Sequence, residues 1–277
     1  MSKPVIRRYF SAEDFSHIKK DCKFLVDKVV KSGFEYDLQI RHNYFNLYYR
    51  GNSLGKIRYV KRDKAYLVNI NRKFAGDEIK KKFGGQPRSN NYLRFSLTPN
   101  RLRSFYRSVN LSAMARKVRD VNYHEETTFE QILITDNVGR TDLIIVDRQI
   151  NQAESRGRQD LLALVQRRNN NYQFCAIEVK LGNNPELKGD VIEQLESYIK
   201  KISSYFGDYK KCYELNFSQK QELGLLQTEL TPNIISEVSG LIVVGGYSGI
   251  ASKSISELRR RRVPAAIKIL QLKNLED

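Results

Sequence analysis

Cysteine and histidine are both scarce, with three residues of each among 277. Cys22, Cys175 and Cys212 are far apart and odd in number, which argues against a disulfide framework and favours a reducing, cytoplasmic setting. The histidines are equally scattered, so zinc-ligand spacing is absent. No apolar run is long enough to span a bilayer, and neither a signal-peptide pattern nor a Walker loop is present. We therefore expect a cytoplasmic protein without a membrane partner.

Acidic residues are the other deficit. The chain has 31 Asp and Glu against 48 Lys and Arg, which gives a formal net charge of +17. Such an excess of positive charge indicates a polyanionic partner, most often nucleic acid. Hydrophobic residues make up 40% of the chain, which is too many for a disordered protein and sufficient for one large domain or two small ones.

Two neighbouring apolar segments, 160–165 and 174–180, carry charge where a buried strand should not. Side chains alternate between the two faces of a strand, so Glu178 and Lys180 point the same way and Val179 points the other. Asp160 opens the preceding strand and comes within reach of that face if the strands pair. Two carboxylates beside an ammonium group can hold a divalent cation against a phosphate, which is the chemistry of phosphodiester cleavage.

The pattern resembles the PD-(D/E)XK nuclease superfamily, in which an acidic residue and a spacer precede Glu-x-Lys. Asp160 and the run Glu178-Val179-Lys180 supply that signature. The helix expected to follow is predicted at 186–203, and on it Gln194 and Tyr198 lie four residues apart and share a side. Many members of the superfamily carry a Gln-x-x-x-Tyr pair at this place. The resemblance covers residues 123–271, about half of the chain.

This resemblance implies roles for the matching residues. It implies that Mg²⁺, or Mn²⁺ in its place, is held by Asp160, Glu178 and the main-chain carbonyl of Val179. Lys180 would position the attacking water, and Gln194 would orient water or hold a phosphate. Tyr198 would be a helper, through a hydrogen bond to phosphate, unless it only packs at the edge of the helix.

Other acidic residues compete for these roles. Gly139-Arg140-Thr141-Asp142 nearly repeats the residues before Asp160, but a short hairpin fits the 18-residue gap from Asp160 to Glu178 better than the longer gap from Asp142. Asp147 is interpreted as a turn residue at the end of its strand. Members of the superfamily often add a Glu from the first helix, and Glu130 is the better candidate there, although a solvated helix face also explains it.

The hydrophobic period divides the chain into two regions. In the first we predict a helix at 10–32, strands between 36 and 70, a loop at 73–91 and a basic helix at 100–119. In the second we predict a helix at 125–135, strands at 141–147, 160–166, 174–180, 240–244 and 265–270, and the helix at 186–203. We expect an α/β protein with a basic N-terminal α+β region at 1–99 and a restriction-endonuclease-like αβββαβ core at 100–277.

Basic and aromatic residues are interleaved in the first region, where cations can grip phosphates and aromatic rings can stack on unpaired bases. A small sheet with an aromatic core explains the same pattern. The predicted nucleic-acid contacts are Arg50, Lys56, Arg58, Arg103, Arg107, Arg259, Arg260 and Arg261. The sequence thus favours a metal-dependent nuclease acting on DNA rather than RNA. A non-catalytic nucleic-acid-binding module, or a subunit of a larger defence or repair complex, is the alternative, and protein partners or a homo-oligomer stay open.

Overall fold

The computed structural model describes residues 4–121, 125–151, 158–261 and 263–272. The chain forms two compact units. The N-terminal unit comprises residues 6–127 and 212–227, and the C-terminal unit comprises residues 1–5, 128–211 and 228–277. The division between the units at 127/128 differs from the expected boundary at 99/100, because the helices between 99 and 121 belong with the first sheet.

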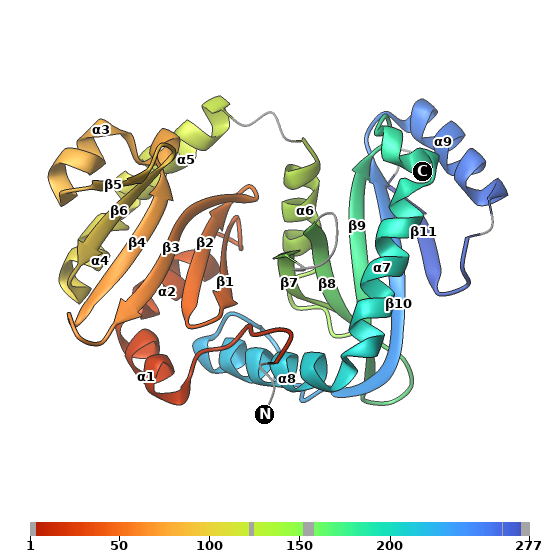
Figure 1. The fold of residues 1–277 in the computed structure, drawn as a ribbon, viewed down its shortest axis with the longest axis horizontal. Helices are drawn as coiled ribbons and strands as arrows, with labels where there is room; N and C mark the ends of the chain where they lie inside the picture. The colour runs from red at the N-terminus through yellow and green to blue at the C-terminus, as the bar shows by residue number, and fades with distance from the viewer. Residues whose placement is uncertain (1–3, 122–124, 152–157, 262, 273–277) are drawn as a thin grey trace. The chain divides into compact units, whose positions relative to one another are not determined.

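The N-terminal unit is built on an antiparallel sheet with the strand order β1-β2-β3-β4-β6-β5 (Figure 1). Its strands are β1 (Tyr36–Arg41), β2 (Tyr44–Tyr49), β3 (Asn52–Val60), β4 (Ala65–Asn71), β5 (Gln86–Ser89) and β6 (Tyr92–Leu97). Phe45, Ile57 and Val68 come from consecutive strands, share one face through the strand register, and are fully buried. The strands predicted between 36 and 70 are therefore confirmed.

This unit also contains the helices α1 (Ala12–Asp21), α2 (Lys23–Lys31), α3 (Arg72–Phe83), α4 (Pro99–Phe105) and α5 (Ser108–Val121). Ser11 caps α1, since its side chain accepts a hydrogen bond from the amide of Asp14. The single helix predicted at 10–32 is instead two helices that meet at Cys22. The basic helix predicted at 100–119 is likewise two helices, α4 and α5.

The loop predicted at 73–91 is wrong, because the segment forms α3 and β5. Its many charged residues suggested a solvated loop, yet Phe74, Ile79 and Phe83 are buried against the rest of the unit. Gly76 has a positive φ of 72° and kinks the helix, a conformation that glycine adopts at little cost. A few well-placed apolar side chains thus outweigh the polar composition of the segment.

The C-terminal unit contains a mixed sheet with the order β11-β10-β9-β8-β7. Its strands are β7 (Leu143–Asn151), β8 (Arg158–Gln166), β9 (Asn171–Leu181), β10 (Asn233–Gly245) and β11 (Ile267–Gln271). The first three are joined antiparallel, whereas β9, β10 and β11 run parallel. All five predicted strands are confirmed, and the protein is an α/β protein as expected.

The helices of the C-terminal unit are α6 (Glu125–Asp136), the short 3-10 helix η1 (Pro185–Lys188), α7 (Asp190–Ser204) and α9 (Ser248–Arg260). Helix α8 (Phe206–Leu223) contributes residues to both units. The predicted helix at 186–203 is found as η1 and α7, but α8 and α9 were not predicted. Of the predicted nucleic-acid contacts, Arg259 and Arg260 lie inside α9.

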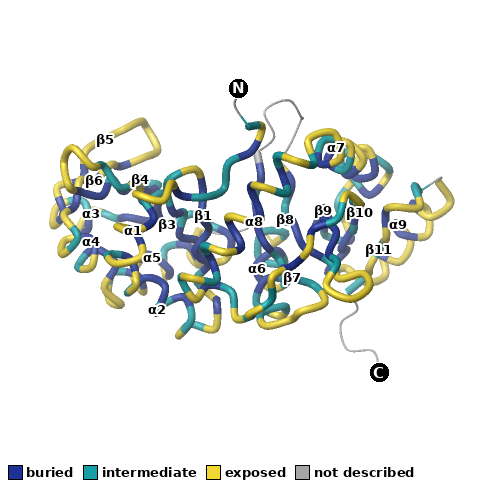
Figure 2. The backbone as a smooth tube through the Cα atoms, turned by 90° about the horizontal axis from the view of Figure 1, so that it is seen from below, coloured by how far each residue is buried: buried dark blue, intermediate teal, exposed yellow. Residues whose placement is uncertain are grey.

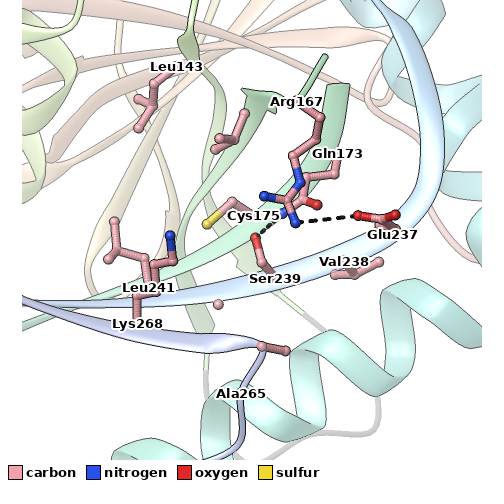
Figure 3. A pocket seen from close by; sticks show the side chains of 13 residues that line it. Leu143, Arg167, Gln173, Cys175, Glu237, Val238, Ser239, Leu241, Ala265 and Lys268 are labelled. Carbon is pink, nitrogen blue, oxygen red and sulfur yellow. Dashed lines mark hydrogen bonds and ion pairs between the residues drawn. The ribbon is translucent and has the colours of Figure 1, made fainter. Parts of the chain in front are cut away.

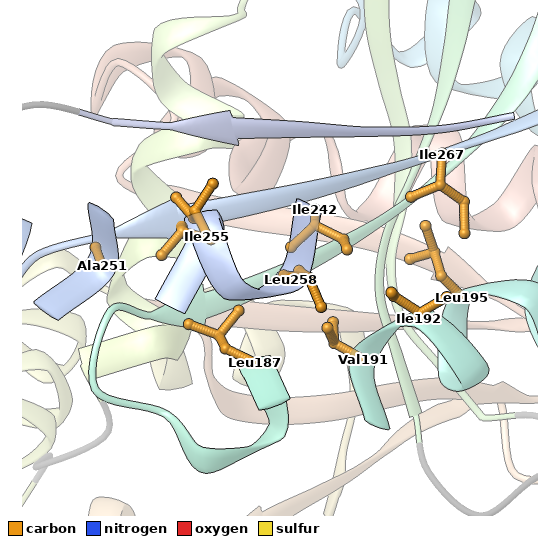
Figure 4. Packing of buried hydrophobic residues seen from close by; sticks show 10 residues of the cluster. Leu187, Val191, Ile192, Leu195, Ile242, Ala251, Ile255, Leu258 and Ile267 are labelled. Carbon is orange, nitrogen blue, oxygen red and sulfur yellow. The ribbon is translucent and has the colours of Figure 1, made fainter. Parts of the chain in front are cut away.

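Strand β9, at the centre of the second sheet, is buried along almost its whole length, so side chains on both faces of the sheet are covered there (Figure 2). One face packs on α7 and α9, through residues such as Leu195, Ile242 and Leu258 (Figure 4). Gly240 of β10 lets α7 come this close, because a Cβ at that position would collide with Leu195. The other face packs on α6 through Ile134. In the described part of the chain, no helix has both the length and the apolarity needed to cross a membrane.

Candidate active site

The pairing of β8 with β9 brings the predicted carboxylates together. Its last paired residues are Leu161 and Ile177. Beyond this pair, the strands are joined by hydrogen bonds from main-chain amides to side-chain carboxylates. The amide of Val179 donates to Asp160 Oδ2 at 2.9 Å, and the amide of Asp160 lies 3.4 Å from Glu178 Oε1. Asp160 and Glu178 therefore sit side by side at one end of the strand pair.

The register also decides which face carries the site. Glu178 and Lys180 pair with Ile242 and Val244, which belong to the core under α7 and α9. Val179 faces the opposite way, into the core under α6. Glu178 is 1% exposed and Lys180 is 8% exposed. The alternation expected from Glu-x-Lys is thus present, and it places two charged side chains in an otherwise apolar layer.

Lys180 is held between two carboxylates. Its Nζ lies 3.2 Å from Glu178 Oε2 and 2.6 Å from Glu186 Oε2. Glu186 is in η1, where the side chain of Asn184 caps its amide. Sequence reasoning did not single out Glu186. Its position shortly after the Glu-x-Lys strand was the one available signal.

The charges of the site perturb one another. Burial, followed by the charges of Glu178 and Glu130, raises the pKa of Asp160 well above its usual value. Burial also raises the pKa of Glu178, although Lys180 acts against this effect. Burial would lower the pKa of Lys180, but the attraction of the carboxylates is stronger, and the pKa is raised. Lys180 is accordingly a firmly protonated cation, suited to holding an anion rather than to removing a proton.

The two helix residues of the predicted pattern differ in position. Tyr198 of α7 is buried, and burial together with the charges of Glu178 and Asp160 raises the pKa of its hydroxyl group. The charges of both carboxylates therefore act on the hydroxyl group of Tyr198. Gln194 is half-buried on the same helix. No contact described for this part of the chain joins Gln194 to Asp160, Glu178 or Lys180, so its predicted role stays a prediction.

Glu130 is not on a solvated helix face. It is 3% exposed, and its Oε2 accepts a hydrogen bond at 2.9 Å from Nη2 of the fully buried Arg148. Gln131 binds Nη1 of the same guanidinium. Glu130 also contributes to the raised pKa of Asp160. On the same helix, Ile132 is exposed whereas Phe129 and Leu133 pack on the core.

The competing aspartates lie elsewhere. Asp142 is exposed, and it pairs with Arg140 at 3.0 Å. That ion pair lowers the pKa of Asp142. Asp147 is inside β7 rather than at a turn, is buried, and accepts a hydrogen bond from the amide of Arg148. The structure therefore favours Asp160 over Asp142 as the partner of Glu178.

The residues present fit a divalent cation. The negative charge of Glu178 contributes to the raised pKa of Asp160, and a cation between the two carboxylates would offset that repulsion. Within the described residues, no three His, Cys, Asp or Glu side chains form a complete metal cage. Mg²⁺ does not need such a cage, since one or two carboxylates with water and substrate phosphate can suffice.

The predicted basic contacts are distributed over both units. Arg259 and Arg261 line a hollow of about 380 Å³ in the C-terminal unit. Helix α9 packs on η1, which carries Glu186. In the N-terminal unit, Arg50 lies over the ring of Tyr49, and Arg103 over that of Phe24. Arg58, Arg107 and Arg260 are exposed, and Lys56 is half-buried.

A second hollow, of about 420 Å³, lies on the other face of the sheet (Figure 3). Cys175 lines this hollow. Cys175 and Glu178 are three residues apart on β9, so their side chains lie on opposite faces and Cys175 points away from the charged site. An ion pair between Arg167 and Glu237 lies at its rim. The hollow is therefore separate from the candidate active site.

No family model, curated protein or solved structure matches this chain.

The raised pKa of Asp160 has a consequence for stability. A carboxyl group whose folded pKa is raised stabilises the fold below its unfolded pKa of about 4 and loses that contribution as pH rises through the folded value. We therefore expect Asp160→Asn to increase the free energy of unfolding of the metal-free protein at neutral pH, but not below pH of about 4. Urea unfolding in chelator at several pH values measures this. A variant that is destabilised at neutral pH would contradict it.

Proposed function

We propose that the C-terminal unit is a metal-dependent nuclease that hydrolyses phosphodiester bonds, with DNA favoured over RNA. The observation that carries this proposal is the meeting of Asp160 and Glu178 beside Lys180 on one face of β8 and β9. The element order supports it: α6, β7, β8, β9, α7 and β10 follow the αβββαβ order implied by the resemblance to PD-(D/E)XK nucleases. Helix α8 is inserted before β10, and α9 and β11 follow it.

Each residue of the site would have a distinct role in hydrolysis. Asp160 and Glu178 would hold Mg²⁺ or Mn²⁺, with the carbonyl of Val179 as a further ligand. The bound cation would supply charge neutralisation at the phosphate and lower the pKa of a water. The raised pKa of Lys180 favours its protonated form, and its ammonium group would bind a phosphate oxygen or orient the water. The charges of Asp160 and Glu178 act on the hydroxyl group of Tyr198, which would serve as a donor for phosphate.

The arrangement also explains why Lys180 is held so firmly. Glu178 forms an ion pair with Lys180 and would also be a ligand of the cation. Glu186 supplies a second negative partner that keeps the ammonium group near β9. A positioned donor beside a phosphate stabilises the charge that develops in the transition state.

The proposal is tested by incubating the full chain with linear, circular and single-stranded DNA and RNA. We expect cleavage in Mg²⁺ or Mn²⁺ and none in excess chelator, because the carboxylates cannot act without the cation. Cleavage of circular substrates would identify endonuclease action. A folded protein that cuts none of these substrates with either ion would contradict the proposal and favour a non-catalytic nucleic-acid-binding module.

A further inference from the structure

One face of the N-terminal sheet is polar and basic. Lys56 pairs with Asn69 on the neighbouring strand, and Asn69 pairs with Arg94 on the next. These three side chains therefore share one face of the sheet, and the buried side chains of Phe45 and Ile57 lie on the opposite face. We call it the cationic face and define it by six residues: Tyr44, Lys56, Arg58, Arg88, Tyr92 and Arg94. Arg58, Arg88 and Arg94 are exposed. These three residues come from three different strands, so the charge extends across the sheet.

The described strands that carry the cationic face supply no acidic side chain to it. The described strands β2 to β6 contain no Asp or Glu. Burial, and then the charges of Arg88 and Arg58, lowers the pKa of Lys56. The cations are therefore close enough to repel one another. A polyanion bound here would relieve this repulsion and release counterions at the same time.

Aromatic rings accompany the cations. Lys56 Nζ lies 3.9 Å from the centre of the Tyr44 ring. Tyr92 is 44% exposed, so its ring is accessible to a ligand. Cations between aromatic faces on a sheet suit a chain of phosphates whose bases are unpaired, since an unpaired base can stack on a ring and a paired base cannot.

Only part of the polar side of the sheet is covered. Lys220 of α8 donates to Gln39 of β1 at 2.8 Å, and Gln39 pairs with Asn46 on the same side as Lys56. The neighbouring Asp37 is buried there and accepts a hydrogen bond from Gln39. At the other end of the sheet every residue of β5 is exposed (Figure 2). The accessible part of this side is thus the part that carries Arg88, Tyr92 and Arg94.

We propose that the cationic face binds single-stranded nucleic acid, with the four cations on the phosphates and Tyr44 and Tyr92 stacked on bases. This surface lies in the N-terminal unit and is argued from its own residues. It goes beyond the proposed nuclease and does not depend on it.

The test is fluorescence anisotropy with labelled oligo(dT), oligo(rU) and a duplex, in chelator. Arg58→Glu/Arg88→Glu exchanges two exposed cations of the face for anions. Lys20→Glu/Lys31→Glu is the matched control, because it makes the same change in net charge on α1 and α2, whose residues are exposed at these positions. Tyr92→Ala removes one ring without changing charge. Thermal unfolding of each variant confirms that it is folded, and Arg58→Gln/Arg88→Gln replaces the double variant if it is not.

We expect one or both single strands to bind more tightly than the duplex. The Arg58/Arg88 variant should bind at least tenfold more weakly, with the slope of log K against log salt shallower by about 0.7 for each lost phosphate contact. Tyr92→Ala should lose roughly fivefold or more on single strands only. Equal loss in the Lys20/Lys31 control would overturn the proposal, and so would duplex binding at equal or higher affinity with no effect of Tyr92→Ala. Because chelator prevents cutting, a protein that binds but never cleaves contradicts only the nuclease.

Discussion

Glu178→Ala is expected to lower metal-dependent cleavage by about a thousandfold or more. Glu178 touches both charged partners of the site, since it lies beside Asp160 and forms an ion pair with Lys180. Removing it would take away one of two carboxylates for the cation, and a bound metal supplies several kcal/mol of transition-state stabilisation. The measurement is the initial rate of DNA cleavage in Mg²⁺ at saturating enzyme.

Asp142→Asn is the matched control for that loss. It also removes one carboxylate near the start of a strand, but Asp142 is exposed and pairs only with Arg140 among its described contacts. Cleavage by Asp142→Asn should stay within about threefold of wild type, because the variant keeps both proposed metal ligands. The fold should also be kept, since an exposed ion pair contributes only about 0–1 kcal/mol to stability. Unchanged cleavage by Glu178→Ala would dismiss the site, whereas loss of cleavage in Asp142→Asn would show that the wrong aspartate had been chosen.

Arg148→Met is expected to cost about 3–5 kcal/mol in the free energy of unfolding. Arg148 is fully buried and binds Glu130, which is 3% exposed. Removing the guanidinium leaves a buried carboxylate without its cation, and that penalty exceeds the loss of the interaction itself. Urea unfolding measures the change.

Arg140→Met provides the matched comparison, because Arg140 also pairs with a carboxylate but at the surface. It should cost about 0–1 kcal/mol. The double variant Glu130→Leu/Arg148→Met should recover much of the loss, since it removes both charges and leaves apolar side chains. If Arg148→Met destabilised the protein no more than Arg140→Met, the buried pair would not be a structural element of the unit.

Local patterns in the sequence were sufficient to predict most strands and the strand pair of the candidate site. Alternation put Glu178 and Lys180 on one face and Val179 on the other, and the 18-residue spacing favoured Asp160 as the partner. The alternation of side chains follows from the two-residue period of a strand, and the spacing follows from the length of a hairpin. Both are determined by residues that are close together in the sequence.

The elements that were mispredicted depend on distant contacts. Segment 73–91 is too polar to suggest α3 and β5, and it is ordered by the packing of Phe74 and Phe83. The sequence of its helix suggests that Glu130 is a surface residue. It is instead buried, in an ion pair with Arg148 of β7. The ion pair between Glu186 and Lys180 depends on the position of η1, which the sequence pattern did not indicate.

The sequence by itself determined the signs and the kinds of chemical group: a strong cationic excess, two acidic residues and a lysine on adjacent apolar strands. Only the tertiary structure decided which acid meets Glu178, whether Lys180 keeps its proton, and which cations share an accessible sheet face. The physical reason is that charge–charge energies and burial depend on distances between segments far apart in the chain, whereas a sequence pattern reports only on neighbours along it.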